Sequence, residues 1–304
     1  MIFVAAAPEV PALPRSQSGG SPQHLLLTLL GDYWYGQPAP LPSAALVALL
    51  GEFGITEISA RATLSRLSRR GLLTLSRVGR NTYYALSGRA ARVLEDGLRH
   101  IVAFGATEQP WSGSWTVAVF SVPEEQRDLR HALRTRLSWL GFASLFDGVW
   151  VCPHERVAEI TGVLSELGID SATVLRAEVA EGSPLGGDPL TAWDLDALRA
   201  RYDALIDEYS PVRTRLAEGS IGTAEALVVR TALMDAWNRF PGLDPGLPSV
   251  LLPQPWPRAR ARELFTELYD ALALLAEQRV KQVIGRYDRD VAALVRGHGS
   301  DYAG

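Results

Sequence analysis

Cysteine and histidine are scarce in this 304-residue sequence, which restricts the chemistry that it can perform. The single cysteine, Cys152, cannot form an internal disulfide bond, so a cytoplasmic location is expected. The five histidines are scattered and form no His-x-x-x-His pair, so no zinc site is expected. Neither a glycine-rich nucleotide loop nor a Gly-x-Ser-x-Gly nucleophile motif occurs. These absences argue against an enzyme and against a bound metal or cofactor.

Long apolar runs are also lacking. No window approaches eighteen uninterrupted apolar residues, so no membrane-spanning helix is expected. Residues 1–21 have no basic region ahead of their apolar part, and we interpret them as a flexible tail rather than a signal peptide. The remaining length is sufficient for two or three domains of ordinary size.

Basic charge is concentrated in one short segment. Eight arginines lie between Gly54 and Arg92, against a single acid, Glu57. This segment carries +7 while the whole chain carries −4, so the residues outside it sum to −11. Cationic charge gathered on one small module is typical of a protein that binds the phosphate backbone of nucleic acid.

Residues 22–104 are predicted to form a winged helix-turn-helix domain with a linker helix. The expected helices are Gln23–Leu30, a second that Ser43 opens, a third between Thr56 and Gly71, and Gly88–Phe104. The aromatic and proline-rich run GDYWYGQPAPLP is expected to be irregular. Two strands, LLTLS and TYYAL, are expected on either side of the turn RVGRN. Three helices followed by a hairpin is the order of a winged helix-turn-helix.

The third helix of this domain is the expected DNA-reading element. Ala60, Leu64 and Leu67 share its buried face, and Arg61 on the other side suits a bidentate contact with guanine. The alternative is that these arginines only solvate a helix face and that the turn residues only satisfy turn geometry. The candidate DNA-binding residues are Thr56, Ile58, Ser59, Arg61, Ala62, Ser65, Arg66, Arg69, Arg77, Arg80 and Asn81.

Residues 114–180 are predicted to form a ferredoxin-like domain, because they follow a β-α-β-β-α-β pattern. The expected elements are Trp115–Val122, Glu124–Leu140, Ala143–Phe146, Gly148–Cys152, Glu155–Leu167 and Ala172–Ala177. A linker, EGSPLGGDP, follows.

Residues 190–296 are predicted to form a helical C-terminal domain. Helices are expected over Asp194–Tyr209, Val212–Glu218, Ala224–Arg239 and from Ala259 to Arg279 or as far as Val295. The proline-rich run FPGLDPGLPSVLLPQPWP is expected to be a tethered loop. The whole chain is therefore assigned to the α+β multidomain class.

The chain resembles the PaaX family of bacterial repressors over roughly Ser21 to Ala276. Three blocks carry the resemblance: FGITEISARATLSRLSRRGLL with GRNTYYAL, GSWTVAVFSVPEEQR with GFASLFDGVWVCP, and FPGLDPGLPSVLLPQPWPRARARELF. The resemblance implies a homodimeric repressor of phenylacetate-type aromatic-acid catabolic genes. It also implies an inverted-repeat operator in double-stranded DNA and release by an aryl-acyl-CoA such as phenylacetyl-CoA. The operator, the regulated genes, the effector and the dimer interface are not determined by the sequence, nor is activation distinguished from repression.

Two groups of residues are candidates for contact with such an effector. One is the arginine stripe Arg127, Arg130 and Arg134, for which a solvated face is the simpler interpretation. The other flanks the proline-rich loop, where an interdomain or dimer contact is an equal alternative: Trp237, Arg239, Trp256 and Arg258.

Two further function classes are weighed against repression. Ferredoxin-like domains of this kind resemble a CRISPR-associated endonuclease, whose acid ends the first strand. Here that place reads Phe120-Ser121-Val122, so a nuclease or hydrolase fused to a targeting module is disfavoured. The third class is an assembly scaffold whose winged domain binds protein.

Overall fold

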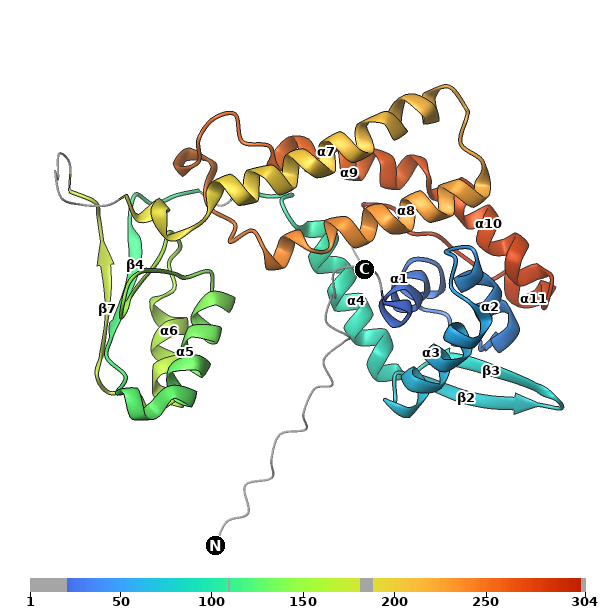
Figure 1. The fold of residues 1–304 in the computed structure, drawn as a ribbon, viewed down its shortest axis with the longest axis horizontal. Helices are drawn as coiled ribbons and strands as arrows, with labels where there is room; N and C mark the ends of the chain where they lie inside the picture. Colours follow the sequence, from blue (N-terminus) through green and yellow to red (C-terminus); the bar gives the residue numbers. More distant parts are fainter. Residues whose placement is uncertain (1–20, 109, 181–187, 302–304) are drawn as a thin grey trace, which may run out of the picture. The chain divides into compact units, whose positions relative to one another are not determined.

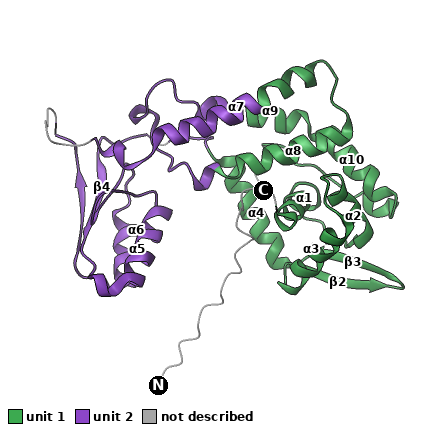
Figure 2. Cartoon of the chain, in the orientation of Figure 1, with its two compact units in different colours: residues 1–104, 209–239, 263–304 green, residues 105–208, 240–262 purple. Residues whose placement is uncertain are grey.

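The computed structural model describes residues 21–108, 110–180 and 188–301, which form a mixed α+β protein with two small sheets. These residues make two compact units (Figures 1 and 2). Unit 1 contains the residues up to Phe104, Tyr209–Arg239 and those from Glu263 onward, and unit 2 contains Gly105–Glu208 and Phe240–Arg262. Most of the tail expected over residues 1–21 and of the linker expected over 181–189 lies outside the described residues.

Unit 1 begins with three helices: α1 (Pro22–Trp34), α2 (Ser43–Gly51) and α3 (Glu57–Arg69). Ser21 caps α1, as expected, because its side chain accepts a hydrogen bond from the His24 amide. The expectation that α1 ends at Leu30 is wrong. Tyr33 and Trp34 continue the helix because both are buried, and the Trp34 indole donates to the Ala39 carbonyl at 2.9 Å.

The sheet of unit 1 has the strand order β1-β3-β2 and is antiparallel throughout. Its strands are β1 (Leu41–Pro42), β2 (Leu73–Val78) and β3 (Asn81–Leu86). The short β1 was not expected from the sequence. The expected five-residue turn is also wrong, because Arg77 pairs with Thr82 and Val78 pairs with Asn81 inside the ladder. The turn contains only Gly79 and Arg80, with Gly79 at a φ of 60°.

The other helices of unit 1 come from two separate stretches of the chain. They are α4 (Gly88–Ala103), α8 (Thr223–Trp237), α10 (Ala273–Gly285), α11 (Arg289–Ala292) and parts of α7 (Leu195–Ala217) and α9 (Arg258–Ala271). The expected break before Val212 is wrong, since Pro211 lies inside α7. The helix buries Tyr202, Ile206 and Tyr209. The stabilisation from this burial outweighs the loss of the one backbone hydrogen bond that proline cannot donate. The expected single last helix is interrupted at Leu272 and ends at Gly285.

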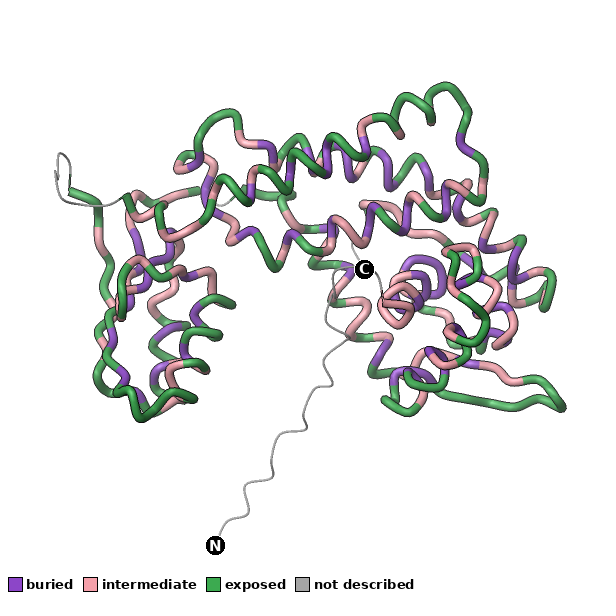
Figure 3. Tube along the Cα trace, viewed as in Figure 1, coloured by how far each residue is buried: buried purple, intermediate pink, exposed green. Residues whose placement is uncertain are grey.

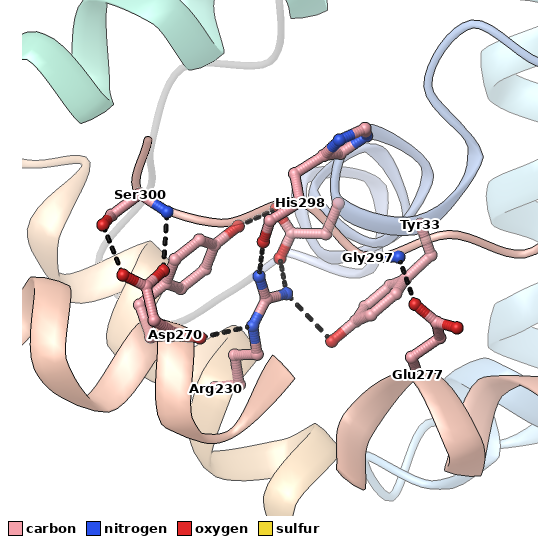
Figure 4. A network of polar contacts seen from close by, with 9 residues as sticks. Tyr33, Arg230, Asp270, Glu277, Gly297, His298 and Ser300 are labelled. Atoms are coloured by element: carbon pink, nitrogen blue, oxygen red, sulfur yellow. Dashed lines mark hydrogen bonds and ion pairs between the residues drawn. The ribbon is translucent and has the colours of Figure 1, made fainter. Parts of the chain in front are cut away.

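A buried ionic network stabilises the centre of unit 1 (Figure 4). The fully buried Arg230 of α8 donates to the Tyr269 carbonyl at 2.9 Å, to the Tyr33 hydroxyl at 3.1 Å and to the His298 carbonyl. Its Nη1 lies 3.4 Å from the carboxylate of Asp32, which also accepts from the Tyr269 hydroxyl at 2.9 Å. Burial raises the pKa of Asp32, and the charge of Arg230 partly offsets that effect. The network therefore joins α1 to α8, α9 and the residues after α11.

Unit 2 contains an antiparallel sheet of order β5-β6-β4-β7 that packs on two helices. The strands are β4 (Trp115–Phe120), β5 (Ala143–Phe146), β6 (Val149–Cys152) and β7 (Ala172–Ala177), and the helices are α5 (Arg127–Trp139) and α6 (Val157–Glu166). The expected β-α-β-β-α-β order is confirmed. Gly148 closes the β5–β6 hairpin at a φ of 74°, and a Cβ there would lie 2.6 Å from the Phe120 carbonyl oxygen. Figure 3 shows buried segments on both the sheet and the helices of this unit. Leu133, Leu137 and Ile160 are among the fully buried core residues.

Candidate nucleic-acid interface

Helix α3 has one buried face and one exposed face. Thr56 caps it, as expected, by accepting from the Ser59 amide at 3.4 Å. Ala60, Leu64 and Leu67 are buried, and α3 packs against α1 and α2. Because these three residues recur at helical spacing, their burial leaves the other face of α3 in solvent.

The exposed face of α3 carries a large apolar residue and a paired arginine near its first turn. Ile58 is 84% exposed, which is unusual for isoleucine and suits contact with a thymine methyl group. Arg61 lies 2.8 Å from the Glu57 carboxylate, one turn earlier. Exposed pairs of this spacing stabilise a helix by only about 0.3–0.5 kcal/mol. Arg61 can therefore exchange this carboxylate for another acceptor at small cost.

Three arginines gather at the other end of α3. Arg66, Arg69 and Arg70, together with Gln23 of α1, line a shallow depression. Arg70 donates to the Gln23 side chain at 3.2 Å. Within the described part of the chain, Arg66 and Arg69 form no ion pair. A depression lined by three arginines suits a phosphate group.

The β2–β3 hairpin adds further exposed cations. In Figure 1 it extends beyond the helices of unit 1. Arg77, Arg80 and Asn81 are exposed, and Val78 beside the turn is 65% exposed. Among the described residues, neither Arg77 nor Arg80 has a carboxylate partner.

The expected DNA-binding residues are almost all accessible. Ser59 and Ala62 are half-buried, and the remaining members of the set are exposed, all within unit 1. Sequence reasoning missed Gln23, which reaches the arginine depression from α1. No local signal marks it, because its contact with Arg70 spans 47 positions of the chain.

The expected effector-binding arginines of α5 are engaged with carboxylates. Arg127 and Arg130 lie 3.0 and 2.7 Å from Glu124, and Arg134 lies 3.2 Å from Asp147. The hydrogen bond from Arg130 is the main reason why the pKa of Glu124 lies below its usual value.

The expected effector-binding residues around the proline-rich loop are divided between the two units. Trp237 is fully buried in unit 1, where it stacks on Phe265 with ring centroids 4.9 Å apart. Arg239 pairs with Asp235 at 2.7 Å. The last two belong to unit 2: Trp256 lies against the Arg199 guanidinium, and Arg258 pairs with Asp244 at 2.7 Å.

Neither a metal-binding cluster nor a membrane-spanning helix is found among the described residues. No three acidic, histidine or cysteine side chains within the described ranges gather closely enough to hold a metal ion. None of the helices in the described part combines the length and the apolar character that a bilayer-spanning segment needs.

The chain is similar to a curated protein and to a solved structure. It is 27% identical over 255 residues to "Transcriptional repressor PaaX" of Escherichia coli (strain K12), covering 82% of this chain and 79% of that protein. The structure of "Uncharacterized protein Rv0674 from Mycobacterium tuberculosis" is similar with a TM-score of 0.55 and 24% identity. That likeness covers 90% of this chain and 98% of the other, and it concerns the fold alone.

Three family models match the chain in succession. The model "PaaX-like protein" matches residues 21–90, "PaaX protein central Cas2-like domain" matches 108–185, and "PaaX-like protein C-terminal domain" matches 193–282. The first match contains α3 and the hairpin, and the second contains the sheet of unit 2. With all three parts present in order, the chain belongs to the PaaX family.

Proposed function

We propose that this protein is a transcriptional repressor that binds double-stranded DNA through a winged helix-turn-helix. In this proposal α3 enters the major groove, Arg61 reads a guanine, and Ile58 and Ser65 contact neighbouring base edges. Arg66 and Arg69 bind phosphates, and Arg77, Arg80 and Asn81 on the hairpin contact phosphates or the minor groove.

The observation that carries this proposal is the group of exposed arginines that have no carboxylate partner among the described residues. Arg66, Arg69, Arg77 and Arg80 stand on one helix and the adjoining hairpin in a protein of net charge −4. An acidic protein with a local cationic surface attracts a polyanion to that surface alone. The name of the E. coli relative supports repression and a regulator rather than an enzyme.

The finer parts of the proposal extend the family relationship. The functional division is 22–104 for DNA binding, 114–180 for the ferredoxin-like domain and 190–296 for the helical C-terminal domain. The protein acts in the cytoplasm as a homodimer on an inverted repeat, since two-fold symmetry of the protein calls for two-fold symmetry of the site. It controls aromatic-acid catabolic genes of the phenylacetate type and is released from DNA by an aryl-acyl-CoA. This effector binds the conformation that does not bind DNA more tightly than the DNA-binding one, and the difference in affinity sets how far it shifts the equilibrium between them.

The proposed effector site draws on residues of both units. It would use Arg127, Arg130, Arg134, Trp237, Arg239, Trp256 and Arg258. The carboxylates that hold five of these side chains would have to be displaced by CoA phosphates.

A mobility-shift experiment tests the proposal. The purified protein is mixed with the DNA upstream of its own gene, with an excess of unrelated DNA, and with or without phenylacetyl-CoA. A retarded complex that survives the competitor supports sequence-specific binding, and its loss with phenylacetyl-CoA supports the effector. Equal competition by unrelated DNA contradicts a specific repressor, and cleavage of the DNA with Mg²⁺ would support the nuclease alternative instead.

A further inference from the structure

A pocket of about 120 Å³ lies within unit 1, between α1, α4 and α8. Helix α1 packs against both other helices. Six of the twelve lining residues have large apolar side chains: Leu27, Val93, Leu94, Leu98, Ile101 and Met234. The volume is comparable with the roughly 150 Å³ engineered cavities that bind benzene. It is therefore large enough for one ring.

Two glycines in helix interiors create this space. Gly31 of α1 and Gly97 of α4 both line the pocket. Neither has a positive φ, so the backbone does not require glycine at either position. A Cβ built on either residue would meet nothing within 4 Å, so close helix packing does not require glycine either. Glycine makes a helix interior less stable than alanine does. At these two positions the absence of a side chain leaves an open volume between the helices.

The polar groups of the lining favour a neutral occupant. The Asp32 carboxylate is already engaged by Arg230 and Tyr269, and the His24 imidazole lies 2.7 Å from Asp235. Neither arginine nor lysine is among the lining residues. A charged ligand would lack a compensating partner in a mostly apolar site, which is costly.

The side-chain amide of Asn238 is available for recognition of a ligand. Within the described residues, the side-chain amide of Asn238 forms no hydrogen bond, although Asn238 lines the pocket. An amide offers both a donor and an acceptor. We propose that this pocket binds a small, neutral and mainly apolar molecule, of about the size of phenol, whose single hydrogen-bonding group contacts Asn238.

The chain offers an unusually direct test, because it contains only two methionines, Met1 and Met234. Protein labelled with ¹³C at the methionine methyl groups is titrated with phenol, with benzoate as the charged control, and followed by NMR. We expect a saturable shift of the Met234 methyl signal with a Kd on the order of 1 mM. The Met1 signal reports any general solvent effect, and benzoate should leave Met234 unshifted.

Substitution of the glycines provides the specificity controls. Gly97→Leu should weaken phenol binding at least about tenfold by filling the pocket. Gly97→Ala, a milder change that favours the helix, should weaken it less but in the same direction. Gly162→Leu is the matched control, since Gly162 lies in α6 with nothing within 4 Å of a Cβ and outside the pocket.

Three results would overturn the proposal. They are the absence of a saturable Met234 shift, retention of the wild-type Kd in both Gly97 variants, and a shift with benzoate or phenylacetyl-CoA but not with phenol. None of these readouts involves DNA, so the site is tested separately from the proposed repressor function.

Discussion

Arginines gather on a helix of each unit, but the two sets differ in what they contact. In unit 2, Arg127, Arg130 and Arg134 of α5 are all paired with carboxylates. In unit 1, Arg66 and Arg69 of α3 have no such partner among the described residues. The arginine charges on α5 are thus balanced by carboxylates, whereas those of Arg66 and Arg69 on α3 are not balanced by any described residue.

The difference follows from the placement of acids. Glu124 precedes α5 by one turn and Asp147 stands in the β5–β6 turn, so carboxylates surround the α5 stripe. Between Gly54 and Arg92 of the sequence the one acid is Glu57, and it engages Arg61. Density of arginine alone therefore does not identify a polyanion-binding surface; the absence of nearby carboxylates distinguishes α3 from α5.

The largest expected effect comes from removing the unpaired arginines. Replacing Arg66, Arg69, Arg77 and Arg80 together by alanine should weaken DNA binding on the order of a hundredfold or more at about 0.1 M salt. The slope of log affinity against log salt should become shallower by up to about 3.6, because each phosphate contact contributes about 0.9. Filter binding at several salt concentrations measures both quantities, and an unchanged slope would contradict phosphate contact by these residues.

A smaller effect is expected at the paired arginine of α3. Arg61→Ala should cost roughly 1–3 kcal/mol of binding free energy and relax the preference at one base pair. Glu57→Gln tests the pair itself, since it removes the carboxylate and leaves Arg61 in place. Competition with operators mutated one position at a time provides the readout, and wild-type behaviour of Arg61→Ala would remove this residue from base recognition.

The paired arginines of α5 should matter least for DNA. Replacing Arg127, Arg130 and Arg134 by alanine should leave DNA affinity within about twofold of wild type and change the melting temperature by about 2 °C or less, because exposed ion pairs contribute little. The same mobility-shift assay and a thermal melt check this. A loss of DNA binding equal to that of the α3 and hairpin variant would remove the distinction between the two surfaces.

The smallest effect concerns the titration of Glu124. The hydrogen bond from Arg130 keeps the pKa of Glu124 below 4.5 in the folded protein. A carboxyl group with a lowered folded pKa stabilises the fold above pH 4.5, and this contribution is lost as the pH falls through the folded pKa. Carboxyl ¹³C NMR should find the pKa of Glu124 higher in Arg130→Ala than in wild type. Identical values would show that the pair does not persist in solution.

The helix and strand order was accessible from the sequence because local patterns determine it. Thr56 caps α3 as expected, and β7 covers the expected residues Ala172–Ala177. The errors lie where tertiary packing outweighs local preference. Tyr33 and Trp34 remain helical because they are buried, and Pro211 is tolerated inside a helix whose preceding turns bury Ile206 and Tyr209.

The sequence predicted most of the residues that form the candidate surface, but it did not predict which arginines are paired with carboxylates. The run of arginines from Arg61 to Arg80 was visible in the sequence, and the structure leaves most of it exposed. The pairing of the α5 arginines depends in part on Asp147, which reaches Arg134 from a later hairpin. No local pattern contains that information, because the contact depends on the fold of the whole domain.

The sequence by itself determined the family blocks, the period of each amphipathic helix and the local excess of positive charge, because these properties belong to neighbouring residues along the chain. Only the tertiary structure decided which arginines have carboxylate partners, that Arg230 is buried beside Asp32, and that Gly31 and Gly97 open a pocket. The physical reason is that burial, ion pairing and cavities are properties of side chains brought together from distant positions, at distances that no local pattern specifies.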